Sequence, residues 1–213
     1  MQLNLRVDFE GVAMFRLLSL LVVVCCSGAL LAGEHNPKLN IGDAAPVWSK
    51  LPGTDGKQHS LDDLKDKKLV VVVFTCNSCP VAVDYEDRII EFAKKHAEDV
   101  GVVAINVNRV EADSMEKMTE RAKEKGFPYP YLFDESQQIA KDYGAGGTPE
   151  FFVLSPERKV IYMGAMDDSA DVKAKKVDYL EPAVQAALAG KKPEVTETYA
   201  NGCRIRYVRK RGK

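Results

Sequence analysis

Two cysteines separated by two residues, Cys76 and Cys79, are the part of the sequence best suited to carry out chemistry. Thiols at this spacing can form a disulfide and reopen it by exchange with a second disulfide, and the attacking species is the thiolate. Pro80 follows directly and suits the first turn of a helix, whose N-terminus would lower the pKa of a nearby thiol. We therefore expect Cys76 to be an exposed thiol of lowered pKa that attacks a substrate, and Cys79 to resolve the mixed disulfide.

A static disulfide and one half of a metal site are the other interpretations of this pair. The histidines His35, His59 and His96 stand far apart, and none flanks the cysteines. Zinc sites use further ligands at short spacing, and copper held by two cysteines needs a third ligand, but no histidine follows His96. We therefore predict no metal and no cofactor, and we favour redox exchange as the function of the pair.

The residues around the cysteines predict the elements that position them. An unbroken apolar run from Leu69 to Phe74 is typical of a central strand that is buried on both faces. The cysteines follow its C-terminal end, and the apolar positions after Pro80 predict a helix that ends near Lys94-Lys95-His96. The order of strand, cysteine loop and helix places the pair at the end of the sheet.

Later segments predict the remainder of an α/β fold, with a mixed central sheet flanked by helices. Val100 to Val107 has the pattern of a second buried strand, and an amphipathic helix from Asp113 to Lys125 follows it, closed by Gly126. Strands at 151–154 and 160–163 form an antiparallel hairpin, which makes the sheet mixed. The other expected elements are an irregular hairpin before a helical turn at 60–63, a helix at 137–143 and a closing helix at 179–189.

The segments from Val71 to Cys79 and from Gly147 to Leu154 resemble the thioredoxin superfamily, and the likeness covers about residues 40 to 190. The resemblance implies a thioredoxin-like fold. In that superfamily a cis-proline lies against the cysteine pair, and Thr148-Pro149 matches it residue by residue, so we expect a cis peptide bond there. The resemblance also implies that Thr148 and Pro149 position the substrate.

More narrowly, the sequence is similar to peroxiredoxin-like redoxins with an alkyl-hydroperoxide-reductase and thiol-specific-antioxidant (AhpC/TSA) domain. The likeness rests on Cys-x-x-Cys-Pro, on the run from Tyr85 to Arg88, and on the ending Gly202-Cys203-x-Ile205. A peroxidase of this family needs a threonine or serine three residues before its reactive cysteine, but the residue three positions before Cys79 is Cys76. The arginine that such a peroxidase also needs would fall at about Pro149. Because a peroxide would find few polarising groups, disulfide exchange is the better hypothesis.

The sequence also departs from thioredoxin itself, because the strand acid that serves that family as a proton shuttle maps to Val70. Asp84 and Glu86, on the helix after the cysteines, are candidates for this task, but charged residues there more often form a solvated helix face. No buried base is therefore predicted for the site.

The first residues predict a secretory signal peptide over 1–33, with Met14 as the alternative start. Arg16 precedes an apolar run that reaches Leu31 and closes on Ala32-Gly33. Cleavage would leave a thioredoxin-like domain over 34–190 and a polar, basic tail over 191–213. An uncleaved membrane anchor is the other interpretation, and in both cases the protein is expected to be exported, to the periplasm or outside the cell.

Removal of the signal leaves three cysteines, Cys76, Cys79 and Cys203. An odd number is informative in an oxidising compartment, because at least one thiol stays unpaired within the chain. Cys203 is therefore either a surface thiol in the tail or a third redox cysteine that exchanges with the pair.

The charge balance excludes one class of partner. The 30 basic and 31 acidic side chains give a net charge of -1, which provides no field that would attract nucleic acid. The expected partners are protein or small-molecule thiols and disulfides, with a membrane involved only through an uncleaved signal anchor. The sequence thus predicts an exported thiol-disulfide oxidoreductase. The alternatives are an antioxidant thiol peroxidase and a non-catalytic thioredoxin-fold binding module that keeps a structural disulfide.

Overall fold

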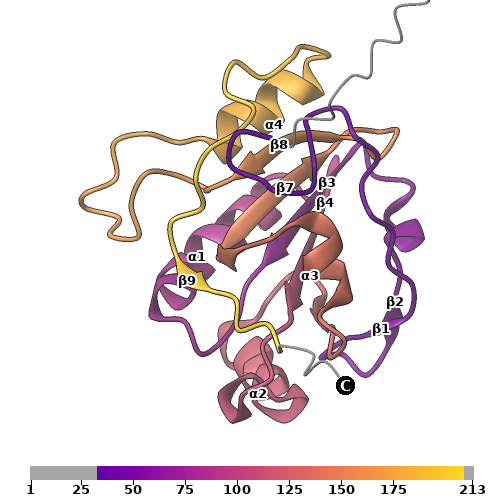
Figure 1. Cartoon of the computed structure of the whole chain (residues 1–213), viewed down its shortest axis with the longest axis vertical. Coiled ribbons are helices and arrows are strands. Elements are labelled where there is room, and N and C mark those ends of the chain that lie inside the picture. Colours follow the sequence, from indigo (N-terminus) through magenta and orange to yellow (C-terminus); the bar gives the residue numbers. More distant parts are fainter. Residues whose placement is uncertain (1–32, 209–213) are drawn as a thin grey trace, which may run out of the picture. The chain divides into compact units, whose positions relative to one another are not determined.

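The central sheet of the computed structural model, which describes residues 33–208, has five strands in the order β5-β4-β3-β7-β8 (Figure 1). β3 pairs in parallel with β4, and β4 with β5, whereas β7 runs antiparallel to both β3 and β8. The mixed sheet predicted from the sequence is confirmed. Its strands are β3 (Leu69–Phe74), β4 (Val100–Asn106), β5 (Tyr131–Phe133), β7 (Glu150–Leu154) and β8 (Val160–Gly164).

Helices cover both faces of this sheet because alternate side chains of each strand point to opposite faces. Odd-numbered residues of β3 such as Val71 and Val73 join one core with α1, α2 and α4, and even-numbered ones such as Val70 and Val72 join a second core with α3 and the N-terminal segment. The flanking helices were predicted correctly. They are α1 (Pro80–Lys95), α2 (Met115–Lys125), α3 (Gln138–Tyr143) and α4 (Leu180–Leu188).

Short elements complete the front of the chain and the crossover after β4. The expected hairpin and helical turn are present as β1 (Leu51–Pro52), β2 (Gln58–His59) and the 3-10 helix η1 (Leu61–Leu64). α2 begins at Met115 rather than at the predicted Asp113, because Ser114 caps it by accepting a hydrogen bond from the Lys117 N–H. Asp113 instead closes a separate 3-10 turn, η2 (Glu111–Asp113).

The segment after α4 does not leave the domain. Backbone hydrogen bonds join Met163 on β8 to Thr196 and Thr198, and β9 (Cys203–Arg204) pairs antiparallel with β6 (Gly147–Thr148). Figure 1 shows this segment running from α4 to β9. Ile205 is buried in the core that includes α3. The segment after residue 190, which the sequence suggested was a polar tail, therefore packs against the domain through this apolar side chain.

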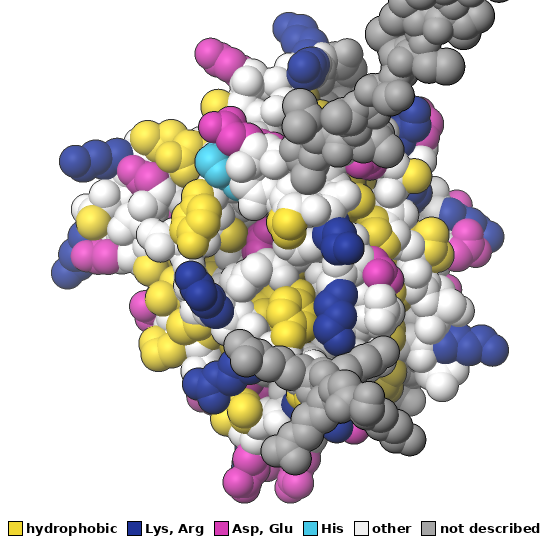
Figure 2. All heavy atoms as spheres, viewed as in Figure 1, with side chains coloured by type: hydrophobic (Ala, Val, Ile, Leu, Met, Phe, Trp, Pro, Cys, Tyr) yellow, Lys and Arg dark blue, Asp and Glu magenta, His cyan; other side chains and the backbone are white. Residues whose placement is uncertain are grey.

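Basic and acidic side chains are interspersed over the face of the molecule drawn in Figure 2. No helix within residues 33–208 is long and apolar enough to span a bilayer. The predicted signal peptide lies outside the described residues.

Candidate redox-active site

The cysteine loop lies between the end of β3 and the start of α1, as the sequence predicts. Cys79 is the N-cap residue of α1, and its sulfur accepts a hydrogen bond from the Ala82 N–H at 3.4 Å. Pro80 occupies the first helical turn, where its missing N–H costs nothing. The helix N-terminus therefore acts on the Cys79 sulfur, whereas the sequence analysis assigned its effect to Cys76.

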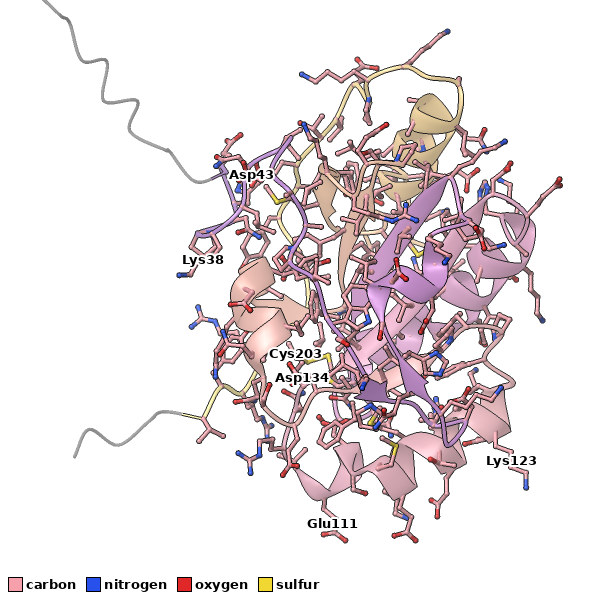
Figure 3. All side chains as sticks on the ribbon, turned by 90° about the vertical axis from the view of Figure 1, so that its right-hand side faces the viewer. Lys38, Asp43, Glu111, Lys123, Asp134 and Cys203 are labelled. Carbon is pink, nitrogen blue, oxygen red and sulfur yellow. A yellow bond between two sulfur atoms is a disulfide. The ribbon has the colours of Figure 1, made fainter. Side chains whose placement is uncertain are left out.

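The disulfide of the site joins Cys79 to Cys203, with the two Cα atoms 5.9 Å apart, and Cys76 is the free thiol among the described residues (Figure 3). The pairing of Cys76 with Cys79 that the motif suggests is therefore not the one observed. Antiparallel pairing of β9 with β6 brings Cys203 to the site, because Cys203 lies opposite Thr148 in that register. All three cysteines pack into one apolar cluster with Ala82.

Burial differs among the three cysteines in a way that corrects the sequence analysis. Cys76 is 3% exposed and Cys79 is 1% exposed, whereas Cys203 is partly exposed. The sequence analysis expected Cys76 to be the exposed cysteine of the pair, but Cys76 is buried in a cluster with Cys79 and Ala82, and Cys203 packs against that cluster. The cysteine that solvent reaches most easily is therefore Cys203.

The pKa of Cys76 is raised above its usual value, where the sequence predicted that it would be lowered. Burial is the largest cause, because it disfavours the charged thiolate, and the negative charge of Asp113 adds to the effect. Hydrogen bonds from Thr148 and Ser78 oppose the shift without reversing it. The resting site thus holds Cys76 as a neutral thiol beside a disulfide.

The peptide bond between Thr148 and Pro149 is cis, which confirms the prediction. The Thr148 hydroxyl lies 3.4 Å from the Cys76 sulfur, and the Thr148 carbonyl oxygen lies 3.2 Å from the Cys79 sulfur. Thr148 and Pro149 are therefore against the cysteine loop, and Thr148 is itself 1% exposed.

A carboxylate that the sequence analysis missed lies beneath the cysteine loop. Asp113, fully buried, accepts hydrogen bonds from the backbone N–H groups of Asn77 and Ser78 and from the Ser78 hydroxyl. It comes from the crossover after β4, the strand next to β3. A signal was present in the sequence, because the loops after neighbouring parallel strands meet at the same end of a sheet.

The two acids that the sequence did name have other surroundings. Asp84 is exposed, and Glu86 is buried in an ion pair with Arg121 on α2, at 2.6 Å between guanidinium nitrogen and carboxylate oxygen. Glu86 is thus not on a solvated helix face, and it ties α1 to α2.

In the part of the chain that the structure describes, no cation forms a hydrogen bond with the sulfur of Cys76 or Cys79. Within residues 33–208, the polar groups next to the Cys76 and Cys79 sulfurs are the hydroxyls of Thr148 and Ser78, the Thr148 carbonyl oxygen, and the backbone N–H groups of Cys79 and Ala82. The position where the redoxin pattern suggests an arginine holds the cis-proline instead.

Strand, cysteine loop and helix, with a cis-proline opposite, define a protein of thioredoxin-like fold with a thiol and disulfide site. The chain belongs to the Redoxin family, which matches residues 40–180.

Known relatives of this chain carry names that point to two activities. The thiol-disulfide oxidoreductase ResA of Bacillus subtilis is 28% identical over 159 residues, which span 70% of this chain and 84% of ResA. A Mycobacterium tuberculosis protein named "Putative peroxiredoxin Rv2521" is 26% identical over 119 residues, which span 54% of this chain and 70% of that protein. The crystal structure of a hypothetical protein from Sinorhizobium meliloti 1021 has a TM-score of 0.76 and 34% identity, and it covers 81% of this chain and 97% of its own. The names of such relatives support an oxidoreductase role.

Proposed function

We propose that this protein is an exported thiol-disulfide oxidoreductase that works by exchange among Cys76, Cys79 and Cys203. The observation that carries the proposal is one disulfide and one free thiol within a single packed cluster of three cysteines. A thiol beside a disulfide allows the disulfide to change partners without any outside reagent. A static structural disulfide has no need of such a neighbouring thiol.

The internal step is a thiol-disulfide exchange. The Cys76 thiolate attacks the Cys79 sulfur, a Cys76–Cys79 bond forms, the Cys79–Cys203 bond breaks, and Cys203 leaves as a thiolate that takes up a proton. No electrons are gained or lost in this step, since one disulfide replaces another. It converts a buried thiol into a partly exposed one.

Exchange with the substrate follows at the surface of the site. The disulfide accepts two electrons from two substrate thiols, which become a disulfide, and the reverse reaction reduces the disulfide of an oxidised partner. Cys203 is the sulfur through which partners would enter, because Cys76 and Cys79 are both nearly inaccessible. Thr148 lies against the sulfurs of Cys76 and Cys79 and is followed by the cis-proline Pro149, and on this ground we assign both residues to substrate positioning.

Turnover of a disulfide substrate tests the proposal. We expect insulin reduction coupled to glutathione to be lost in Cys79→Ser and to fall at least about a hundred-fold in Cys76→Ser. A matched control restores the thiol count at an exposed position, through Ser49→Cys in the Cys76→Ser background, and we expect it to remain inactive. Full activity of Cys76→Ser would show that the assignment is wrong.

A peroxidase is the second candidate, because relatives with peroxiredoxin names exist. We expect hydrogen peroxide to be consumed no faster than by a free thiol, since no cation among residues 33–208 forms a hydrogen bond with the Cys79 sulfur. A non-catalytic binding module is the remaining alternative, and it predicts an inert Cys79–Cys203 disulfide in the insulin assay. Export is tested separately by fusing residues 1–33 to a reporter that is active only outside the cytosol.

A further inference from the structure

A cavity of about 510 Å³ lies where three segments of the chain meet, beside the strand that carries Cys203 (Figure 1). Its walls come from residues 35–38, from the stretch between α3 and the start of β7, and from the segment 197–207 after α4. A volume of this size is typical of sites that enclose a small molecule. The last wall lies outside residues 40–180, which the Redoxin family model matches, so the cavity depends on a segment beyond the family domain.

Glu150, the first residue of β7, lines this cavity with a carboxylate that the fold uses only in part. The residue is 8% exposed. Its Oε2 atom accepts hydrogen bonds from the backbone N–H groups of Gly146 at 2.8 Å and Gly147 at 3.1 Å, whereas Oε1 accepts none from residues 33–208. Burial raises the pKa of Glu150, because the charged carboxylate is poorly solvated there. A positively charged donor that entered the cavity would satisfy both the free oxygen and the charge.

The second acidic residue of the cavity, Glu197, is already occupied. Its carboxylate accepts hydrogen bonds from the backbone N–H groups of Glu34 at 3.0 Å, His35 at 2.6 Å and Asn36 at 3.0 Å. These bonds use both oxygens and fasten the N-terminal segment to the segment after α4. Glu150 is therefore the carboxylate that can receive a ligand.

Three basic residues also line the cavity, namely Lys38, Lys141 and Arg204. None of the three forms an ion pair with a carboxylate of the described residues. Lys38 and Arg204 are exposed and Lys141 is partly exposed, which places them on the open side of the cavity. The cavity thus offers a buried negative charge and, at its mouth, positive charges that can bind a carboxylate.

We propose that this cavity binds a small zwitterionic molecule of the amino-acid and short-peptide class. The ammonium group of the ligand donates a hydrogen bond to Oε1 of Glu150, and the ligand carboxylate binds Arg204 and the lysines at the mouth. Met163 and Ile205, which also line the cavity, provide apolar contacts for a ligand side chain. The inference goes beyond the proposed function, because no sulfur takes part in binding. A cavity that only holds water is the competing explanation.

Calorimetric titration of the full chain with the tripeptide alanyl-leucyl-alanine tests the proposal. The peptide contains no sulfur and cannot react with the Cys79–Cys203 disulfide, so its binding is independent of exchange activity. The N-acetylated peptide lacks the ammonium group, and the C-terminal amide lacks the carboxylate. We expect the unmodified peptide to bind with a dissociation constant below about 1 mM. We expect each modified peptide to bind at least about ten-fold more weakly.

Two pairs of variants assign the contacts. Glu150→Gln keeps one oxygen for the two backbone N–H groups and replaces the free oxygen with an amide, while Glu194→Gln, exposed and outside the cavity, is its control. Arg204→Ala removes a cation at the mouth, and Arg206→Ala, exposed and outside the cavity, is its control. We expect Glu150→Gln to weaken binding of the unmodified peptide at least about ten-fold and Arg204→Ala about three-fold. Both controls should bind like the wild type.

The modified peptides test the same contacts in the wild type, so the outcome does not depend on the folding of any variant. Absence of binding at millimolar concentrations of the unmodified peptide would overturn the proposal. Equal binding of the acetylated peptide would show that the ammonium group is not recognised, and equal binding of the amide would show the same for the carboxylate. Either result would point to one end of a longer chain and against a zwitterion. Wild-type affinity in Glu150→Gln would likewise contradict the assignment of this cavity.

Discussion

The thiol of Cys76 is the residue on which the behaviour of the site depends. A low pKa would make it reactive at all times, next to a disulfide that it can break. Burial and the charge of Asp113 raise that pKa instead, so the thiol stays neutral until its proton is removed.

Thr148 provides a direct test of this view at the residue scale. Burial raises the pKa of the Cys76 thiol, and the contact between the Thr148 hydroxyl and the Cys76 sulfur partly lowers it again. Thr148→Val should therefore raise the pKa of Cys76 further and reduce its alkylation rate near neutral pH by about five-fold, the equivalent of one hydrogen bond of about 1 kcal/mol.

The measurement is iodoacetamide labelling of Cys76 as a function of pH, followed by mass spectrometry. The two rates should converge once the pH exceeds both pKa values. Thr148→Ser retains the hydroxyl and is the control. Faster labelling of Thr148→Val near neutral pH would contradict the argument.

Among the elements, the pairing of β6 with β9 makes the three-cysteine site possible. Each strand has two residues, and the pairing brings Cys203 opposite Thr148. The strands approach so closely that a Cβ atom on Gly202 would lie 2.1 Å from the Thr148 carbonyl oxygen. Glycine at this position is therefore a requirement of the site.

Gly202→Ala should push β9 away from β6 and weaken the Cys79–Cys203 disulfide. We expect a loss of about 1–3 kcal/mol in the free energy of unfolding, as for other overpacked positions. We also expect a smaller fraction of the disulfide at equilibrium in a glutathione redox buffer, measured by peptide mapping. Gly146→Ala is the matched control, because a Cβ there meets nothing within 4 Å. An unchanged disulfide fraction in Gly202→Ala would refute the requirement.

At the scale of the whole molecule, a buried ion pair fastens α1 to the segment between β8 and α4. Arg88 on α1 bonds to the Asp167 carboxylate and to the carbonyl oxygens of Ser169 and Ala170. The Asp167 side chain is 1% exposed, and it also accepts a hydrogen bond from Tyr85 at 2.7 Å. The pair therefore holds a long connection against the helix that follows the cysteines.

Arg88→Ala should destabilise the protein by about 3–5 kcal/mol, because it leaves the Asp167 charge buried without its partner. Chemical denaturation measures the change. Lys68→Ala removes one partner of the ion pair with Asp99, in which the Lys68 and Asp99 side chains are 68% and 36% exposed, and it should destabilise the protein far less than Arg88→Ala does. Similar losses in both variants would show that the buried pair is no stronger than an exposed one.

The fold was largely predictable from local sequence patterns. The apolar run before the cysteines, the proline after them and the glycine that ends α2 each determine structure over a few neighbouring residues. The cis bond at Thr148-Pro149 was also predicted, from the resemblance of its surrounding segment. The strand, the helix start and the helix end depend on backbone sterics and on runs of apolar residues, which a sequence displays directly.

What the sequence determined by itself is the strand, loop and helix that carry Cys76 and Cys79. Only the tertiary structure decided that Cys79 pairs with Cys203, 124 residues later, and that Cys76 is the buried thiol. It also decided that Asp113 lies beneath Ser78. These contacts depend on how β9 pairs and where the crossover after β4 turns, and no local pattern encodes the distance between such segments. Burial and neighbouring charge are products of packing, so the raised pKa of Cys76 follows from the folded chain and not from its motif.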